Sequence, residues 1–170
     1  MLTTATTATT AATEIRVRVA EHAVAGGDAV IATIGLGSCV AIMVHDAAAG
    51  MAALAHVLLP NETLSRDTAN PAKFASTAVP LLLRDLRAAG APGPYTAKLA
   101  GGASMFAQLL PTGGINMGER NVEAARAALA AAGVPVVARD TGGDHGRSVY
   151  LRVADGAVIV RSLKRGASVI

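Results

Sequence analysis

Residues 33–60, TIGLGSCVAIMVHDAAAGMAALAHVLLP, decide the fold that we predict for this chain. Two apolar runs, CVAIMVH and GMAALAHVLLP, are separated by DAAAG, a sequence typical of a loop. Apolar runs of this length joined by a short loop predict an antiparallel hairpin. Pairing His45 with Gly50 across a four-residue loop places Cys39 opposite His56, on the same face, with Cβ atoms about 4.5–5.5 Å apart. The prediction depends on the register, because a slip of one residue would separate the two side chains.

A cysteine beside a histidine predicts a thiol nucleophile with a general base. Cys39 is the only cysteine in the chain, and it follows a glycine-rich turn that contains Gly37 and Ser38. Such a turn exposes backbone N–H groups, which an oxyanion hole for acyl transfer needs. A neighbouring imidazolium at His56 would lower the pKa of the thiol and supply thiolate at neutral pH. Taken singly, a lone cysteine is more often a small buried apolar residue, and His56 an ordinary core histidine.

The other three histidines are weaker candidates. His45 lies on the same predicted strand as Cys39, six residues away and therefore about 20 Å distant. His22 and His145 have no nearby partner in the sequence. No histidine has a second ligand at a recognised zinc spacing, so we expect no metal site. A thiol mechanism needs no cofactor, and we expect none.

Composition limits the classes of protein that the chain can represent. At 170 residues it is most simply one domain, predicted over residues 14–170 after a Thr/Ala-rich leader at 1–13 that we expect to be disordered. The net charge of +3 with scattered basic residues, and aromatic residues at 2%, argue against a nucleic-acid-binding surface. The sequence has no apolar run of about 18 residues and no secretory signal pattern, so we expect a protein that is not inserted in a membrane. A lone cysteine favours a reducing cytoplasm.

The remaining segments predict an α+β fold, a layered sandwich of mostly antiparallel sheet flanked by helices. One helix is expected from Pro71, with Asn70 as its cap, to Ala89, with a kink or restart at Pro80. A second is expected from Asn121, its predicted N-cap, to just before Gly133. Residues 103–118 are predicted to be loop. Strands are expected at 15–24, 29–35, 95–102 and 135–140, and in a C-terminal hairpin that turns at 154–156.

Glycine-rich stretches elsewhere do not match nucleotide-binding motifs. The run GLGSCV at 35–40 has Val40 where a dinucleotide fingerprint has its third glycine, and no helix follows it. The glycine pairs at 101–102, 113–114 and 142–143 lack the lysine and hydroxyl of a phosphate loop, so we interpret them as tight turns. Asp140 and Arg147 flank the last pair, where they could hold a turn as an ion pair or shape the rim of an active site.

Six blocks, in this order and spacing, resemble the chemotaxis protein CheD, the chemoreceptor glutamine deamidase family. They are GLGSCVAIMVHD, AHVLLP, KFASTAV, AKLAGGASMF, MGERNVEAARAAL and DTGGDHGRSV, and the similarity spans roughly residues 15–163. The resemblance implies a layered α/β sandwich with an active site like that of toxin deamidases. It also implies hydrolysis of glutamine side chains on the cytoplasmic helices of chemotaxis receptors to glutamate. The chain departs from the family pattern in its Thr/Ala-rich leader, in Phe74, where tyrosine is common, and in Pro80 of the first predicted helix; these departures bear on partner preference rather than on catalysis.

The same resemblance assigns residues and partners. It places the catalytic cysteine at Cys39, the histidine at His56 and a third catalytic residue at Thr33. It also implies a CheC-type phosphatase as a binding partner. Two alternatives stay open: a docking module without enzymatic activity, and a different cysteine hydrolase, such as a peptidase or a transglutaminase-like enzyme, that uses the same pair.

Overall fold

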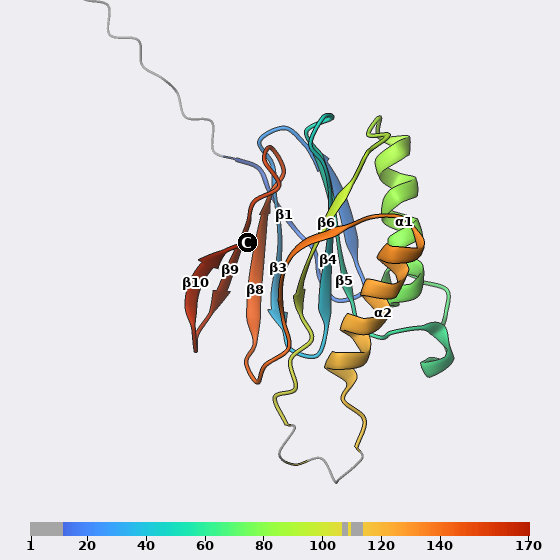
Figure 1. Cartoon of the computed structure of the whole chain (residues 1–170), viewed down its shortest axis with the longest axis vertical. Coiled ribbons are helices and arrows are strands. Elements are labelled where there is room, and N and C mark those ends of the chain that lie inside the picture. Colours follow the sequence, from blue (N-terminus) through green and yellow to red (C-terminus); the bar gives the residue numbers. More distant parts are fainter. Residues whose placement is uncertain (1–11, 107–108, 110–113) are drawn as a thin grey trace, which may run out of the picture.

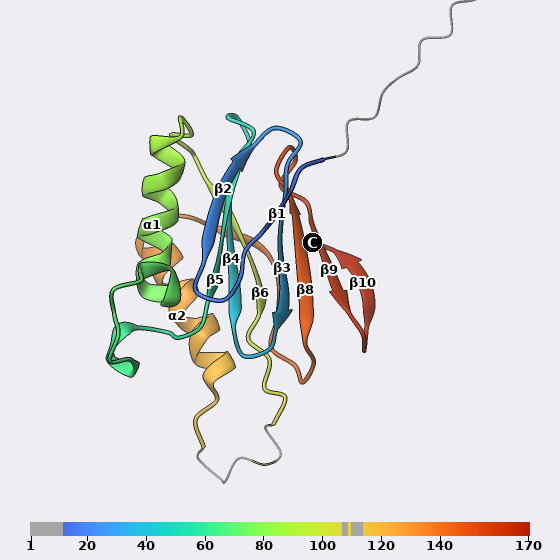
Figure 2. The same ribbon diagram turned by 180° about the vertical axis from the view of Figure 1, so that it is seen from behind.

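The molecule is built from three layers, two β-sheets packed face to face and a pair of helices against one of them. The computed structural model describes residues 12–106, 109 and 114–170. In Figures 1 and 2 both helices cover one side of the middle sheet, and the second sheet lies on its opposite side. The predicted α+β sandwich is confirmed. Of the leader predicted at 1–13, residues 1–11 lie outside the described residues.

Most strand pairs in the described residues are antiparallel, as predicted. Only β1–β3 and β6–β7 pair in parallel. The outer sheet has the order β1 (Glu14–Arg16), β3 (Val30–Leu36), β8 (Arg147–Arg152), β9 (Val158–Ser162), β10 (Gly166–Val169). The middle sheet has the order β2 (His22–Gly26), β5 (Met51–Val57), β4 (Val40–Asp46), β6 (Thr96–Gly101), β7 (Val136–Thr141).

The central hairpin is β4–β5, but its register differs from the prediction by two residues. His56 lies opposite Ala41, not opposite Cys39. The turn moves because Gly50 has a φ of 60° and belongs to the turn rather than to the strand. Asp46 extends β4 by one residue, and its carboxylate accepts the N–H of Ala49 at 2.9 Å and so closes the turn. Since the shift is two residues, Cys39 and His56 still face the same side of the sheet.

The predicted first strand, residues 15–24, is wrong because the chain reverses in its middle. Residues 14–16 form β1 in the outer sheet and residues 22–26 form β2 in the middle sheet. Ala20 has a φ of 61°, a left-handed conformation that breaks the strand. Val17 is buried between the sheets, whereas Val19, predicted on the same face, is half exposed.

The first predicted helix is divided near its start, not at its proline. Asn70 caps a short 3₁₀ turn, η2 (Pro71–Lys73), by accepting the N–H of Ala72, and α1 (Ala75–Ala88) begins after the extended Phe74. Pro80 lies within α1 and does not end it. Buried positions repeat at helical spacing and bring α1 against the middle sheet: Ala75, Ala78, Val79, Leu82, Leu83 and Leu86. A further 3₁₀ turn, η1 (Glu62–Leu64), precedes η2.

The second helix, α2 (Met117–Ala131), begins four residues before the predicted start. Its N-cap is Asn116, whose side chain accepts the N–H of Glu119 at 3.1 Å. Asn121 is therefore not a cap but an interior residue, and it is fully buried. The predicted end before Gly133 is confirmed. Neither α1 nor α2 is long and apolar enough to cross a membrane, and no other helix in the described part of the chain is.

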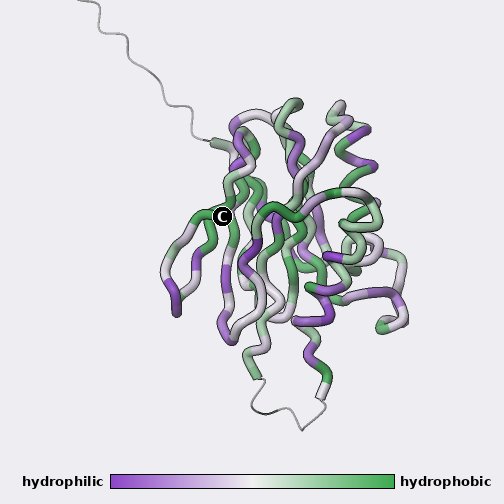
Figure 3. Tube along the Cα trace, in the orientation of Figure 1, coloured by the Kyte–Doolittle hydropathy of each residue, from purple (hydrophilic) through white to green (hydrophobic). Residues whose placement is uncertain are grey.

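Apolar side chains fill both gaps between the layers. Figure 3 shows hydrophobic residues along the strands of the middle sheet and hydrophilic ones at turns and on outward helix faces. Alternate residues of β4 divide between the two cores: Ile42 and Val44 face the helices, while Ala41 and Met43 face the outer sheet. Cys39 belongs to the core between the sheets. The predicted strands at 29–35, 95–102 and 135–140 and the C-terminal hairpin are confirmed, and β10 is an additional strand.

Candidate active site

The candidate site lies where the chain crosses from the outer sheet to the middle sheet. β3 ends at Leu36 in the outer sheet, and β4 begins at Val40 in the middle sheet. Cys39 is the last residue of this crossing. β6 ends, and α2 begins, at the same end of the molecule, the lower end in Figure 1. Four elements from distant parts of the sequence therefore converge around one cysteine.

Cys39 and His56 are diagonal neighbours on one face of the hairpin. Cys39 lies two residues before Ala41, the partner of His56. Diagonal neighbours in an antiparallel pair are about 7–8 Å apart, within reach of long and aromatic side chains. Cys39 is buried with 9% of its surface exposed, whereas His56 is fully buried. The cysteine is thus the less buried residue of the two.

Thr33 and His56 connect the two sheets through a hydrogen bond. Thr33 lies on β3 of the outer sheet, and its Oγ1 is 2.7 Å from His56 Nδ1 on β5 of the middle sheet. The Thr33 hydroxyl also donates to the carbonyl of Val17 at 2.6 Å. Both groups are buried, so this interaction is shielded from water.

The contacts of Thr33 define which nitrogen of the imidazole carries the proton. A hydroxyl has one proton to donate, and the Val17 carbonyl can only accept it. The oxygen of Thr33 must then accept a proton from His56, so Nδ1 is the protonated nitrogen. Nε2 retains its lone pair and has no hydrogen-bond partner among the described residues. A buried acceptor without a partner costs about 1–3 kcal/mol, and such groups are concentrated at functional sites.

Burial shifts both pKa values toward the neutral forms, contrary to the expected thiolate–imidazolium pair. Desolvation lowers the pKa of His56 from 6.5 to about 4. Desolvation also raises the pKa of the Cys39 thiol, and the N–H of Cys39 itself opposes this shift to a smaller extent. At neutral pH the pair is therefore a thiol and a neutral imidazole, and the thiol must lose its proton as it reacts.

The other three histidines have partners elsewhere. His22 Nε2 is 2.8 Å from the carboxylate of Asp85, which holds β2 to α1. His45 Nε2 is 3.0 Å from the carbonyl of Val153, at the opposite end of β4 from Cys39. His145 Nε2 accepts from Arg147 Nη2 at 2.9 Å. That His56 is the partner of Cys39 stays a prediction.

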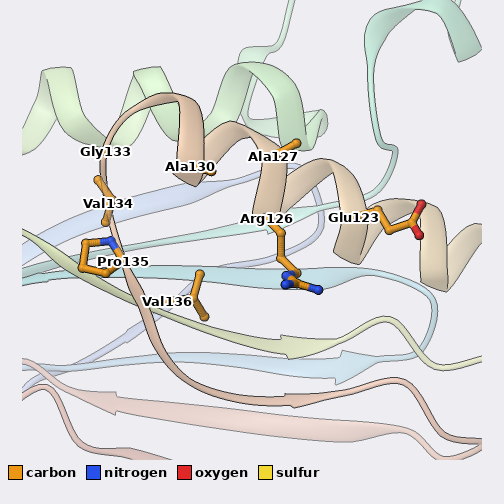
Figure 4. A pocket seen from close by; sticks show the side chains of 8 residues that line it. All are labelled: Glu123, Arg126, Ala127, Ala130, Gly133, Val134, Pro135 and Val136. Carbon is orange, nitrogen blue, oxygen red and sulfur yellow. The ribbon is translucent and has the colours of Figure 1, made fainter.

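No group of three His, Cys, Asp or Glu side chains among the described residues could hold a metal ion. A hollow of about 710 Å³ lies between α2 and β7, away from Cys39. Figure 4 shows its lining, in which Arg126 extends from α2 toward the sheet above an otherwise mostly aliphatic surface. Neither Cys39 nor His56 lines it, so this hollow is not the candidate site.

Comparison with known proteins identifies the family. The family model described as CheD chemotactic sensory transduction matches residues 58–162, more than half of the chain. The chain belongs to this family. The family-model match begins after Thr33, Cys39 and His56, so it does not test their assignment as site residues.

Curated relatives of this CheD-family chain cover nearly its whole length. A probable chemoreceptor glutamine deamidase CheD from Caldanaerobacter subterraneus is 39% identical over 92% of this chain and 97% of its own. A probable chemoreceptor glutamine deamidase CheD 2 from Geobacter metallireducens is 45% identical over 89% and 94%, respectively. A third relative, from Thermococcus kodakarensis, is also named a probable chemoreceptor glutamine deamidase CheD. It is 40% identical over 90% of this chain and 95% of its own.

The glycine pair at 101–102 has a role that the sequence interpretation missed. A Cβ atom on Gly101 would lie 2.3 Å from the carbonyl oxygen of Cys39. Gly102 donates its N–H to that same oxygen at 2.8 Å. In this CheD-family protein the pair is therefore a close approach of β6 to the backbone of Cys39 rather than only a tight turn.

Arg147 and Asp140 form the expected ion pair, at 3.5 Å between Nη1 and Oδ1. The guanidinium also donates to three carbonyls, those of Gly101, Asp140 and Gly142, at 3.0, 2.7 and 2.7 Å. One of these carbonyls belongs to the glycine beside Cys39. The arginine thus both holds a turn and supports one wall of the candidate site, and the two interpretations of the sequence are compatible.

Asn121 is the other residue that the sequence interpretation misplaced. Its side-chain Nδ2 donates to the carbonyls of Ser38 and Leu58, at 2.9 and 3.0 Å. The Ser38 carbonyl directly precedes Cys39. The Leu58 carbonyl directly follows β5, the strand that carries His56. The buried positions of α2 are 118, 121, 125 and 129, so a polar residue falls within the apolar stripe. A polar residue at an apolar position of the helix is the signal in the sequence that could have revealed the buried position of Asn121.

Proposed function

We propose that the protein is a chemoreceptor glutamine deamidase, which hydrolyses glutamine side chains of chemotaxis receptors to glutamate and releases ammonia. The names of the relatives support the reaction and the substrate class. The observation that carries the proposal is the unpaired, buried Nε2 of His56, on the strand paired with β4, which follows Cys39, with Nδ1 fixed by Thr33. This arrangement suits a general base that serves a thiol.

The first half of the reaction would form a thioester. His56 Nε2 takes the proton of the Cys39 thiol as the sulfur attacks the carboxamide carbon of the glutamine. The carbonyl oxygen becomes a negative oxyanion, which backbone N–H groups at Gly37, Ser38 and Cys39 could stabilise. Removal of one such donor typically costs about 3–4 kcal/mol. The protonated imidazole then gives its proton to the departing nitrogen, and ammonia leaves.

The second half would hydrolyse the thioester. His56, neutral again, takes a proton from water as the water oxygen attacks the acyl carbon. The bond to sulfur breaks, the proton returns to Cys39, and a glutamate side chain is released. Atoms balance as one glutamine and one water giving one glutamate and one ammonia. The low pKa of His56 suits this role, because the imidazole starts each half-reaction unprotonated.

Thr33 would keep the imidazole in the reactive orientation, as the third member of other catalytic triads does. Its hydroxyl cannot act as a second acid–base group, because its proton is held by Val17 at 2.6 Å.

The surface near Cys39 supports a protein substrate rather than a small molecule. Two large apolar side chains that follow β6 are exposed, Met105 at 49% and Phe106 at 66%. Met105 lies close to Gly37, since a Cβ atom on that glycine would be 3.4 Å from the methionine methyl group. Apolar side chains gathered on a surface are typical of protein–protein contact sites. A receptor helix could cover them as it presents its glutamine to the sulfur.

The test is incubation of the purified protein with a receptor cytoplasmic fragment, followed by peptide mass mapping. Deamidation adds about one dalton to a glutamine-containing peptide, without cleavage or cross-linking, which separates it from the peptidase and transglutaminase alternatives. Cys39→Ser should abolish ammonia release while the circular dichroism spectrum stays unchanged, and His56→Ala should remove most of the rate. Near-normal activity of folded Cys39→Ser would refute the mechanism.

Two further parts of the sequence-based hypothesis stay predictions. One is the cytoplasmic location. The other is the CheC-type phosphatase as a partner.

A further inference from the structure

A single buried side chain connects the cysteine segment to the histidine strand. Asn121 is fully buried in α2, and its Nδ2 donates to the carbonyl oxygens of Ser38 and Leu58 at 2.9 and 3.0 Å. Both protons of one amide nitrogen are thus used on the two segments that carry Cys39 and His56. The amide oxygen, Oδ1, has no partner among the described residues. Burying an unpaired oxygen costs about 1–3 kcal/mol, so an apolar residue would serve the core better.

The contact to Ser38 determines the direction of the next N–H group. The peptide bond between Ser38 and Cys39 is trans and planar, so its carbonyl and its N–H point in opposite directions. Asn121 holds the carbonyl toward α2, which directs the Cys39 N–H away from the helix. The N–H and the side chain of Cys39 are carried by the same Cα atom, so the N–H lies near the sulfur. An oxyanion formed on a carbon bonded to this sulfur would lie within reach of the same N–H.

Two glycines allow α2 to come close enough for this contact. Gly118 lies one helical turn before Asn121, and a Cβ atom on it would be 2.5 Å from the carbonyl oxygens of Gly102 and Ala103. A Cβ atom on Gly102 would be 2.9 Å from the Gly118 carbonyl. Backbone therefore packs on backbone where α2 passes the end of β6. A larger residue at position 118 would push the helix, and the Asn121 amide with it, away from Ser38.

We propose that Asn121 is a positioning residue of the deamidase, which orients the Ser38–Cys39 peptide so that the Cys39 N–H donates to the oxyanion. This inference rests on the proposed function and names the group that sets up its oxyanion site. Asn121 does not touch the substrate and acts only through the peptide that it holds. The proposal differs from a merely structural role because it predicts a loss confined to steps that form an oxyanion.

The test compares Asn121→Asp with Asn116→Ala in the full-length protein. Asn121→Asp keeps the shape of the side chain but removes both donors. Asn116→Ala removes the N-cap of the same helix, so it weakens α2 without contact to Ser38 or Leu58. Two reactions are measured for each variant, ammonia release from a receptor fragment and alkylation of Cys39 by iodoacetamide. Alkylation needs the thiol but forms no oxyanion, and Cys39 is the only cysteine to react.

For Asn121→Asp we expect kcat to fall about 100-fold, with KM and the alkylation rate changed by no more than about threefold. Asn116→Ala should keep its kcat per folded molecule within about twofold of the natural protein. Gly118→Ala, a second variant, should show the same selective loss as Asn121→Asp. An unchanged kcat in folded Asn121→Asp would overturn the proposal. So would a parallel fall in kcat and alkylation, or an equal loss in Asn116→Ala.

A crystal structure of Asn121→Asp tests the same point without any substrate. We expect the Ser38 carbonyl to turn away from α2, since a carboxylate cannot donate to it. An unchanged carbonyl direction would overturn the inference even if the protein proved not to be a deamidase. In contrast, absence of ammonia release from the unaltered protein would refute the proposed function alone.

Discussion

Replacement of Thr33 by valine tests the hydrogen bond that joins the two sheets at the candidate site. Valine has nearly the same shape as threonine but neither donates nor accepts. In Thr33→Val the Val17 carbonyl loses its donor and the His56 Nδ1–H loses its acceptor, in a place with almost no access to water. Each buried polar group left without a hydrogen-bond partner costs about 1–3 kcal/mol, so loss of both partners should lower the free energy of unfolding by about 2–6 kcal/mol. Most domains have a free energy of unfolding of about 5–15 kcal/mol, so the variant should still fold at low temperature.

The effect on catalysis follows from the tautomer. Without Thr33 the imidazole proton is no longer held on Nδ1, and the form with the proton on Nε2, which cannot accept from the thiol, becomes populated. Loss of a hydrogen bond worth about 1.4–2.8 kcal/mol corresponds to a 10–100-fold fall in kcat. The matched control is Thr33→Ser, which keeps the hydroxyl and should stay within about fivefold of the natural protein.

The assay is ammonia release at a temperature where circular dichroism shows each variant to be folded. Imidazole nitrogen NMR reads the tautomer of His56 directly, and it should show Nδ1 protonated in the natural protein and a mixture in Thr33→Val. The reasoning is refuted if folded Thr33→Val keeps its kcat within twofold, or if Thr33→Ser loses as much activity as Thr33→Val.

Two further predictions follow from the pKa shifts of the buried pair. Below pH 6.5 the imidazole of His56 is protonated in the unfolded chain, but it is protonated in the folded protein only near pH 4. The unfolded state therefore binds more protons in this window, and the free energy of unfolding should fall by up to about 3 kcal/mol from pH 6.5 to 4. Urea denaturation of His56→Gln should lack this slope, and equal slopes in both proteins would contradict the assignment. Because burial raises the pKa of Cys39, its alkylation rate in the free protein should still increase above pH 9. A rate that is constant from pH 7 upward would instead indicate a preformed thiolate.

The sequence was sufficient to predict the hairpin and the shared face of Cys39 and His56, but not their register. Alternation of apolar residues sets which side chains share a face, and a two-residue shift preserves that pattern. The position of the turn depends on Gly50 taking a positive φ and on Asp46 accepting a backbone N–H, details that apolar periodicity does not carry. Apolar periodicity therefore predicts that the two residues share a face, but not that they are diagonal rather than directly opposite neighbours.

Contacts between distant segments account for what the sequence analysis missed. Asn121 has the residue type of an N-cap, and nothing nearby in the sequence indicates that α2 starts at Met117. Only the packing of the helix against β6 and the Cys39 segment gives Asn121 its two carbonyl partners. Thr33 entered the candidate site through resemblance to a family, since its link to His56 exists only after the two sheets have packed.

That link also sets the point in biosynthesis at which the enzyme could become active. β3, which carries Thr33, joins the outer sheet by pairing with β8, and β8 is completed only at Arg152. A nascent chain that has already emerged past Cys39 and His56 would have both reactive groups but no fixed tautomer. Unfinished polypeptides on the ribosome would thus carry an unreactive thiol until translation has passed Arg152 and β8 can pair with β3.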